Sequence, residues 1–166
     1  MSHIESFNVA QGANPRILIL GSIPGIASLQ AGQYYAHPRN AFWPIICHYF
    51  HMDVNLPYEP RLADLKRNGV ALWDVLHRAK RQGSLDSAIE KQSMEPNPID
   101  FWLEENSTVS KILLNGGTAA KEFRRNFKPL LQQSSLQVIT CPSTSPAYAA
   151  MPVDEKRRRW HAALMA

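Results

Sequence analysis

The sequence predicts an α/β protein with a short central sheet of four mainly parallel strands covered by helices on both faces. Two observations support this fold class. Short apolar runs that end at glycine or polar residues alternate along the chain with segments whose apolar residues recur at helical spacing. The length of 166 residues suits one compact domain, and 45% hydrophobic with 19% charged residues exclude disorder for the bulk of the chain. We therefore expect a single three-layer α/β/α domain over residues 1–166.

The strands are predicted from four short apolar segments. Residues 16–20, which Gly21 follows, form a buried run that ends in a sharp turn. Residues 111–114 and 136–140 have the same apolar character. Residues 70–73 fit either a strand or a buried bend, because a run of this length does not distinguish the two.

Helices are predicted between these strands. The apolar residues of Phe42–Phe50 recur at i, i+3, i+4, i+7 and i+8, which places Pro44 in the first helical turn. Strand and helix thus alternate along the chain, as in parallel sheets. The other predicted helices are residues 60–67, 86–91 and 99–105, about 118–127, and a last helix with Asp154 as N-cap that ends near Ala163.

Charge and cysteine content narrow the class of protein. The formal net charge of +4 mildly favours a polyanionic partner. The longest uninterrupted aliphatic stretch covers only residues 17–20, so neither a signal peptide nor a spanning helix fits, and we expect a cytoplasmic protein without membrane contact. Cys47 and Cys141 are too few for a disulfide framework, and Cys47, His48 and His51 lack the second ligand pair of a structural metal site.

Three loops are placed to form a ligand site, because a parallel sheet binds its ligand beyond the carboxyl ends of its strands. The first, residues 21–40, begins Gly-Ser-Ile-Pro-Gly, and residues 33–43 read Gln-Tyr-Tyr-Ala-His-Pro-Arg-Asn-Ala-Phe-Trp. The second is Asn-Gly-Gly at 115–117, and the third, residues 141–148, reads Cys-Pro-Ser-Thr-Ser-Pro-Ala-Tyr. Together these motifs resemble the uracil-DNA glycosylase superfamily over residues 16–160, and its hypoxanthine-DNA glycosylase branch most closely.

The resemblance implies a monofunctional DNA glycosylase of base excision repair. Such an enzyme flips a deaminated base out of DNA and hydrolyses the bond between sugar and base. The expected base is hypoxanthine from deoxyinosine, and the product is an abasic site. We expect a monomer without a cofactor, whose partners are DNA that contains deaminated bases and the downstream enzymes that repair abasic sites. None of the three loops holds a lysine that could form a Schiff base.

Two alternatives remain open. Uracil presents a hydrogen-bonding edge similar to that of hypoxanthine, so a uracil or mixed-specificity glycosylase fits the same motifs. A catalytically weak lesion-binding module also fits, because Ile23 occupies the position where most of the superfamily has an Asp or Asn that orients water. A comparison of base release from deoxyinosine and uracil duplexes distinguishes the first alternative from a hypoxanthine-specific glycosylase. Binding of these duplexes without base release identifies the second.

Asn40 is the catalytic residue that the resemblance implies. The hypoxanthine branch uses the Asn of its His-Pro-x-Asn segment, which is Asn40 here. An amide does not titrate near neutrality, so Asn40 would position and polarise water through its carbonyl oxygen. From the residues alone, an Asn just before Phe42 is better interpreted as a helix N-cap, and the two roles can coexist.

The resemblance also implies a set of base-binding residues. Tyr35 matches the aromatic residue on which the flipped base stacks, with Tyr34 as the candidate if the turn faces the other way. Asn115 matches the residue that reads the Watson–Crick edge of the base, although the motif by itself favours an Asn that satisfies the Asn-Gly-Gly turn. Ser22 and Ile23 complete the predicted base-binding set.

The predicted DNA-binding residues flank this set. His37 is a candidate donor to the leaving base or to a phosphate, or else a turn residue, and Arg39 is a candidate phosphate ligand. The basic run 156–159 is interpreted as a solvated helix face. The third loop corresponds to the minor-groove or intercalation loop of the family through Pro142, Ser143, Thr144, Ser145 and Pro146, with Thr144 equally well explained as part of a turn.

Overall fold

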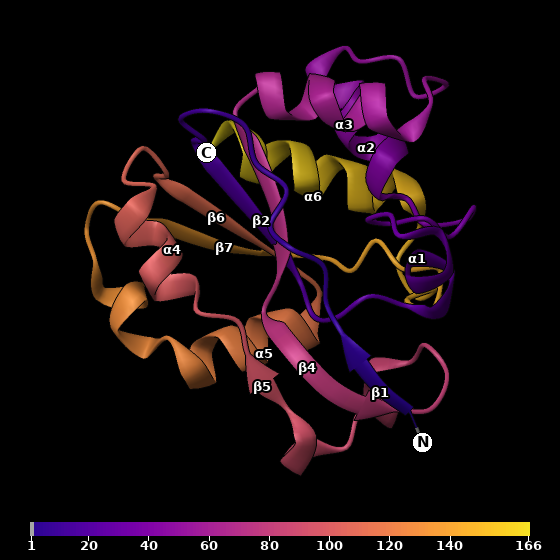
Figure 1. The fold of residues 1–166 in the computed structure, drawn as a ribbon. Helices are drawn as coiled ribbons and strands as arrows, with labels where there is room; N and C mark the ends of the chain where they lie inside the picture. Colours follow the sequence, from indigo (N-terminus) through magenta and orange to yellow (C-terminus); the bar gives the residue numbers. More distant parts are fainter. Residues whose placement is uncertain (1) are drawn as a thin grey trace.

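The central sheet has four strands whose neighbours are all parallel. The computed structural model, which describes residues 2–166, arranges them in the order β3 (Val70–Asp74), β2 (Ile17–Gly21), β6 (Lys111–Asn115) and β7 (Gln137–Cys141) (Figure 1). Every residue of β3 and β6 is buried, as expected for strands covered on both faces. The predicted four-stranded sheet is confirmed, and residues 70–73 belong to a strand.

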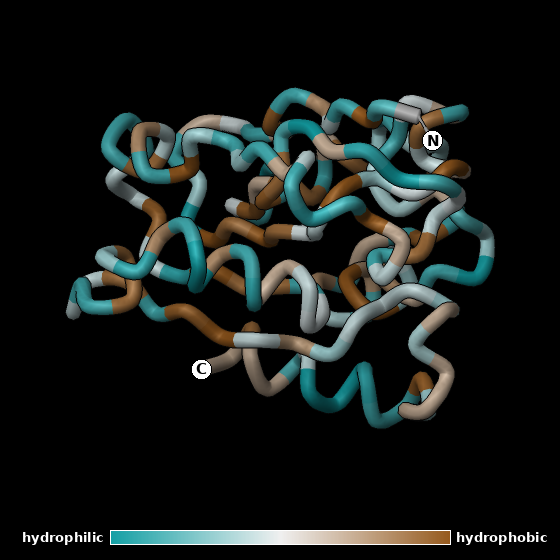
Figure 2. Tube along the Cα trace, turned by 90° about the horizontal axis from the view of Figure 1, so that it is seen from below, coloured by the Kyte–Doolittle hydropathy of each residue, from teal (hydrophilic) through white to brown (hydrophobic). Residues whose placement is uncertain are grey.

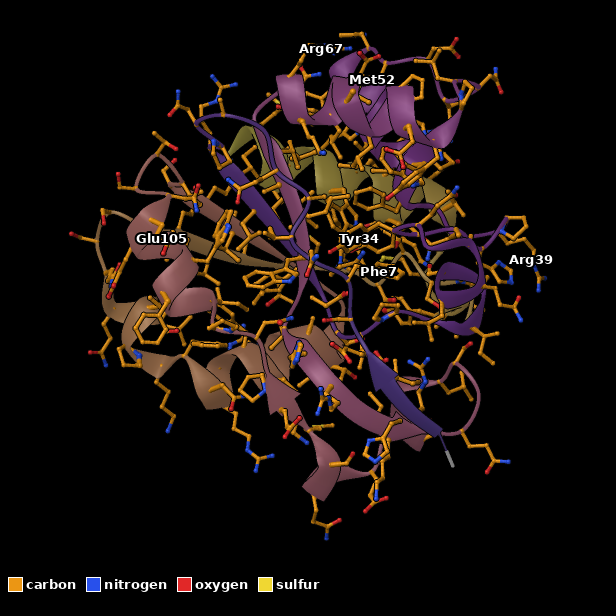
Figure 3. All side chains as sticks on the ribbon, viewed as in Figure 1. Phe7, Tyr34, Arg39, Met52, Arg67 and Glu105 are labelled. Atoms are coloured by element: carbon orange, nitrogen blue, oxygen red, sulfur yellow. The ribbon has the colours of Figure 1, made fainter. Side chains whose placement is uncertain are left out.

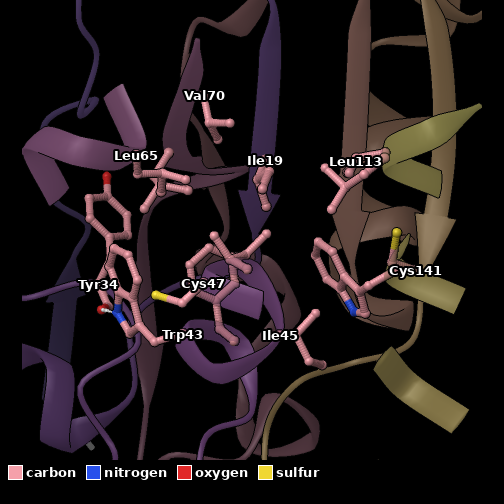
Figure 4. Close-up of a cluster of buried hydrophobic side chains, with 14 of the residues drawn as sticks. Ile19, Tyr34, Trp43, Ile45, Cys47, Leu65, Val70, Leu113 and Cys141 are labelled. Carbon is pink, nitrogen blue, oxygen red and sulfur yellow. Dashed lines mark hydrogen bonds between the residues drawn. The ribbon is translucent and has the colours of Figure 1, made fainter. Parts of the chain in front are cut away.

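Helices cover both faces of this sheet. Side chains alternate along β2, so Ile19 packs on one face while Leu18 and Leu20 pack on the other. Trp43 and Leu65 belong to the cluster around Ile19 (Figure 4). The predicted three-layer α/β/α arrangement is confirmed. The first face is covered by α2 (Phe42–Phe50), α3 (Tyr58–Arg67) and α6 (Val153–Met165), and the second by α4 (Ile99–Glu105), α5 (Gly117–Asn126) and the 3-10 helix η3 (Lys128–Gln132).

A smaller sheet that the sequence analysis did not include lies beside the first. Its antiparallel strands have the order β1 (Ser2–Glu5), β4 (Leu76–Arg81) and β5 (Glu95–Pro96) (Figure 1). Only Val75 separates β3 from β4, and its N–H donates to the Gly21 carbonyl oxygen at 2.8 Å. The chain therefore leaves the parallel sheet beside the end of β2.

The prediction of a helix over residues 86–91 is wrong. Two 3-10 turns, η1 (Asp86–Ala88) and η2 (Lys91–Ser93), take its place. Ile89 between them is extended and forms a bridge with Arg81 of β4, which prevents a continuous helix.

The prediction of Asp154 as the N-cap of the last helix is also wrong. Pro152, whose backbone is extended, occupies the N-cap position of α6, and Asp154 lies in the first turn. An acidic side chain is favourable there because it faces the positive end of the helix dipole. A short helix, α1 (Ile26–Ala31), was not predicted.

Hydropathy follows this layered arrangement. The hydrophobic stretches of the chain run mostly through the middle of the molecule, and many hydrophilic turns lie at its periphery (Figure 2). The helices α2 and α4 have the predicted bounds, whereas α3 begins at Tyr58 and α6 continues to Met165. No helix within residues 2–166 has the length and apolar character needed to cross a membrane.

Candidate functional site

A cavity of about 540 Å³ opens where the sequence analysis expects a ligand, beyond the carboxyl ends of the parallel strands. Its volume is typical of pockets that bind small organic groups. All three predicted loops contribute to the lining, together with residues 84–87, which follow β4. The predicted site residues in the lining are Ser22, Ile23, Tyr35, His37, Asn40, Asn115, Ser143, Thr144, Ser145 and Pro146.

Two predicted DNA-binding residues, Pro142 and Arg39, lie outside this lining. The Pro142 carbonyl oxygen accepts a hydrogen bond from Trp160 Nε1 at 2.9 Å, which anchors the third loop to α6. Arg39 is exposed at the edge of the molecule (Figure 3). Its N–H donates to His37 Nδ1 at 3.1 Å, so His37 takes part in the turn, which is one of the two roles considered for it. Contacts of His37 and Arg39 with DNA stay predictions.

Asn40 lines the cavity just before α2. Its Oδ1 accepts a hydrogen bond from the Phe42 N–H at 2.9 Å, and its own N–H donates to the His37 carbonyl oxygen at 2.9 Å. Ala41 occupies the N-cap position, yet the Asn40 side chain satisfies the first N–H of the helix. A carbonyl oxygen has two lone pairs, so Oδ1 keeps one acceptor site for water.

Tyr35 has a left-handed backbone, with φ of 57°. This conformation is uncommon for a bulky side chain and costs on the order of 1–3 kcal/mol. Hydrogen bonds on both sides hold it: the Ala36 N–H donates to Ser28 Oγ at 3.1 Å, and Trp43 Nε1 donates to the Tyr34 carbonyl oxygen at 3.0 Å. The surrounding structure thus fixes the direction of the Tyr35 side chain.

The Tyr35 ring stacks on Phe42, with ring centroids 4.0 Å apart and planes inclined by 19°, and lines the cavity. Its buried Oη has no hydrogen-bond partner among residues 2–166. Burial, and then the charge of Asp74, raises the pKa of this phenol, so it stays protonated and able to donate. Tyr34 packs edge-to-face on Phe7 at 5.3 Å (Figure 3), and its hydroxyl donates to a backbone carbonyl. Stacking of a base on Tyr35 stays a prediction.

Asn115, the last residue of β6, connects two of the loops. Its Nδ2 donates to Thr144 Oγ1 at 3.0 Å, and the Thr144 N–H donates to Asn115 Oδ1 at 3.0 Å. The Thr144 carbonyl oxygen in turn accepts the Ala41 N–H at 3.0 Å, so the buried Thr144 bridges the third loop to the first. The Asn115 amide keeps one hydrogen and one lone pair, and its role in reading the base stays a prediction.

The prediction of a solvated face over residues 156–159 is wrong for Lys156. This residue is only 3% exposed, and its Nζ donates to the Ser145 carbonyl oxygen at 3.2 Å and lies 5.1 Å from the Tyr148 ring centre. Its spacing explains the burial, because Lys156 is one turn before Trp160 on the inner face of α6. The three arginines that follow pair with Asp154 and Glu155 on the same helix.

Ser22 connects the first loop to the 3-10 turn η1, and Ile23 connects it to β4. Ser22 Oγ donates to Asp86 Oδ1 at 2.9 Å. Ile23 is buried against Leu76 and Ala79 of β4, and it also lines the cavity. An isoleucine side chain carries no polar atom, so it shapes the wall without binding water.

Asp74, the last residue of β3, was not predicted from the sequence as a site residue. Its side chain lines the cavity, is 4% exposed, and has no hydrogen-bond partner for Oδ2 within residues 2–166. Burial, and then the charge of Asp86, raises the pKa of this carboxyl to about 7, although Arg81 acts in the opposite direction. A polar residue at the end of a buried strand was the available signal, as at Asn115.

This chain is similar in sequence and fold to known proteins. The family model described as the uracil DNA glycosylase superfamily matches residues 8–164. A Methanosarcina barkeri protein named hypoxanthine DNA glycosylase is 34% identical over 135 residues, which cover 81% of this chain and 81% of that protein. A Methanosarcina acetivorans protein of the same name is 35% identical over 144 residues, which cover 86% of this chain and 87% of that protein. A solution NMR structure of a Methanosarcina acetivorans protein, described as a candidate uracil DNA glycosylase, has a TM-score of 0.81 and 30% identity and covers 97% of this chain and 96% of its own. The predicted resemblance is confirmed: the chain belongs to the uracil DNA glycosylase superfamily.

Proposed function

We propose that this protein is a monofunctional DNA glycosylase that releases hypoxanthine from deoxyinosine in DNA. The main support is one cavity that brings together Tyr35 and Asn40 of the first loop with Asn115 of the second. The two relatives named hypoxanthine DNA glycosylase support the choice of base.

The chemistry of the cavity suits an uncharged base. An aromatic ring at Tyr35 offers a stacking surface, and amides at Asn40 and Asn115 offer donors and acceptors. Among the described residues, the lining includes the carboxyl groups of Asp74 and Asp86 but no Lys or Arg side chain. A phosphate would meet no Lys or Arg side chain in this part of the lining, whereas a flipped base carries no charge that needs one.

The proposed reaction is hydrolysis at the sugar. The Asn40 Oδ1 accepts a hydrogen bond from a water molecule and orients it toward C1′ of the flipped nucleotide. The water oxygen bonds to C1′ while the C1′–N9 bond breaks, and its electron pair leaves with the purine. The proton released by the water ends on the base, so the products are hypoxanthine and an abasic site. We also propose that the protein acts as a monomer in the cytoplasm and that abasic-site repair enzymes take over its product.

A panel of duplexes tests this proposal. The purified protein is incubated, with a metal chelator present, with labelled duplexes that contain one deoxyinosine, one uracil or no lesion, and the strands are resolved with and without alkali. We expect the deoxyinosine strand that was incubated with the protein to be cleaved only when alkali is added, because a monofunctional enzyme leaves the abasic strand intact.

Each other outcome would overturn a defined part of the proposal. Cleavage at uracil alone would keep the superfamily and discard hypoxanthine as the substrate. Strand cleavage without alkali would exclude a monofunctional enzyme. Tight binding of the deoxyinosine duplex without base release would leave a lesion-binding module.

A further inference from the structure

The Asp74 carboxyl is the buried ionisable group of the cavity that the proposed reaction does not use. The backbone around it is fixed, because the Asp74 carbonyl oxygen accepts a hydrogen bond from Asn97 Nδ2 at 2.8 Å and the next N–H donates to Gly21 at 2.8 Å. A Cβ at position 21 would lie 2.6 Å from Asp74 Oδ1, so the glycine leaves the room that this oxygen occupies. The side chain is thus held against the end of β2, at the cavity wall.

Within residues 2–166, Asp74 Oδ2 has no hydrogen-bond partner, and the charge of Arg81 only partly offsets the effects that raise the pKa of Asp74. Arg81 Nε and one of its terminal nitrogens donate instead to the carbonyl oxygens of Gly83 and Pro24, each at 2.7 Å. The neighbouring Tyr35 Oη also has no partner among the described residues. The titratable and charged groups around the carboxyl are Asp86 of η1, Arg81 of β4, and Tyr34, Tyr35 and His37 of the first loop.

A neutral carboxyl group has a hydrogen-bond donor and an acceptor side by side, whereas a carboxylate only accepts. Hypoxanthine presents the complementary pair on one edge, since its O6 accepts and its N1–H donates. A carboxylate would accept from N1–H but would face O6 with a second acceptor. The N1–H proton can bond only one acceptor, which Asn115 provides, so the neutral form of Asp74 supplies a donor to O6 and the ionised form does not.

We propose that the neutral carboxyl group of Asp74 donates a hydrogen bond to O6 of the flipped hypoxanthine, as a base-reading residue beside Asn115. The Asn115 amide oxygen accepts from N1–H, so the two side chains share the edge of the base. This inference rests on the proposed function, and it adds a pH dependence: the enzyme loses a hydrogen bond to the base when Asp74 ionises.

The experiment compares kcat/KM for hypoxanthine release by the wild-type protein, Asp74→Asn and Asp74→Ala between about pH 5.5 and pH 8, since this parameter reports ionisations of the free enzyme. For the wild-type protein we expect a value that falls as the pH rises through about 7. Asparagine offers the same donor and acceptor without titrating, so Asp74→Asn should stay within about threefold of the wild-type maximum at every pH. Asp74→Ala should lose about tenfold or more wherever the wild-type carboxyl is neutral, because O6 loses this donor.

Asp100→Asn is the matched control, because Asp100 is exposed at the start of α4 and lies outside the cavity lining. It should keep the wild-type pH profile. The inference would be overturned if kcat/KM still decreased at alkaline pH in Asp74→Asn, or if Asp74→Ala kept the wild-type kcat/KM. A wild-type protein that releases no base at any pH would instead overturn the proposed function.

A second measurement needs neither turnover nor a folded variant. The carboxyl carbon of Asp74 is titrated by NMR in the wild-type protein, free and bound to a duplex whose deoxyinosine carries a 2′-fluoro group, which slows cleavage of the bond between sugar and base. A hydrogen bond from the neutral acid to the base favours the protonated form, so binding of the duplex should raise the pH midpoint of the Asp74 titration. An unchanged or lowered midpoint would overturn the role of Asp74.

Discussion

Two side chains of the cavity wall, Asn40 and Asp74, represent two kinds of functional residue. Asn40 is neutral at every pH, and its oxygen is already oriented by the first N–H of α2. Asp74 titrates, because burial and Asp86 raise its pKa to about 7. The sequence motif predicted Asn40, whereas Asp74 was missed because its carboxyl becomes unusual only when the folded chain buries it without a partner for Oδ2.

Asp74→Asn is predicted to stabilise the fold at high pH and to leave it unchanged at low pH. The carboxyl has a pKa of about 3.9 in an unfolded chain and about 7 in the folded protein. Between these values the folded state holds the extra proton, so the stability of the wild-type protein falls as the pH rises from about 4 to about 7. Above this range the variant should gain on the order of 2–4 kcal/mol in free energy of unfolding.

Urea unfolding at about pH 4 and pH 8 measures this difference. Asp100→Asn, which removes an exposed carboxyl, should show little difference from the wild-type protein at either pH. A gain from Asp74→Asn that is equal at the two pH values would show that the titration of Asp74 does not cause it.

Helices and strands with regular apolar spacing could be predicted from the sequence, and irregular ones could not. The helices α2 and α4 follow from their apolar positions. In contrast, four of the six residues of β4 are polar, so nothing in the pattern distinguishes this strand from a loop. It forms because Val75 turns the chain beside β2 and because β1 and β5 pair with it, and both are contacts between distant segments.

The junction between β6 and α5 gives a prediction at the level of elements. Gly116 has φ of 94°, and a Cβ there would lie 3.0 Å from the Ser143 Cβ, whereas a Cβ at Gly117 would meet nothing within 4 Å. Gly116→Ala should therefore lower the free energy of unfolding by about 1–3 kcal/mol and displace the third loop from the cavity. Gly117→Ala is the matched control and should be neutral or slightly stabilising, since alanine favours the helix that begins there.

Urea unfolding and the rate of base release check both glycine variants. Equal effects of the two substitutions would contradict the account of Gly116, because only this position combines a left-handed backbone with close contact to the third loop.

The site as a whole depends on segments far apart in the sequence. Its lining extends from Phe7 to Tyr148 and includes residues 84–87, which no sequence motif indicated. The order of strands in the sheet brings the three motif loops to one edge, and hydrogen bonds through Thr144 connect two of them to Asn115. The strand pattern and the motifs predicted this convergence, but the contribution of the smaller sheet required its tertiary pairing.

Binding of the whole molecule to DNA is predicted to weaken as the salt concentration rises. The chain carries a net charge of +4, and cationic contacts with phosphates release counterions from DNA. We expect the affinity for a deoxyinosine duplex to fall by about tenfold or more between about 50 and 200 mM salt. Fluorescence anisotropy measures this dependence. An affinity that does not change over this range would show that phosphate contacts contribute little.

The most direct test of the proposed function measures free hypoxanthine released from a deoxyinosine duplex by the wild-type protein and by Asn40→Ala, with duplex binding measured in parallel. Asn55→Ala, an exposed position outside the cavity lining, is the matched control. We expect the wild-type protein and the control to release hypoxanthine at equal rates. Asn40→Ala should bind the duplex but release the base at least about 100-fold more slowly. Release by Asn40→Ala at the wild-type rate, or no release by the wild-type protein, would contradict the account.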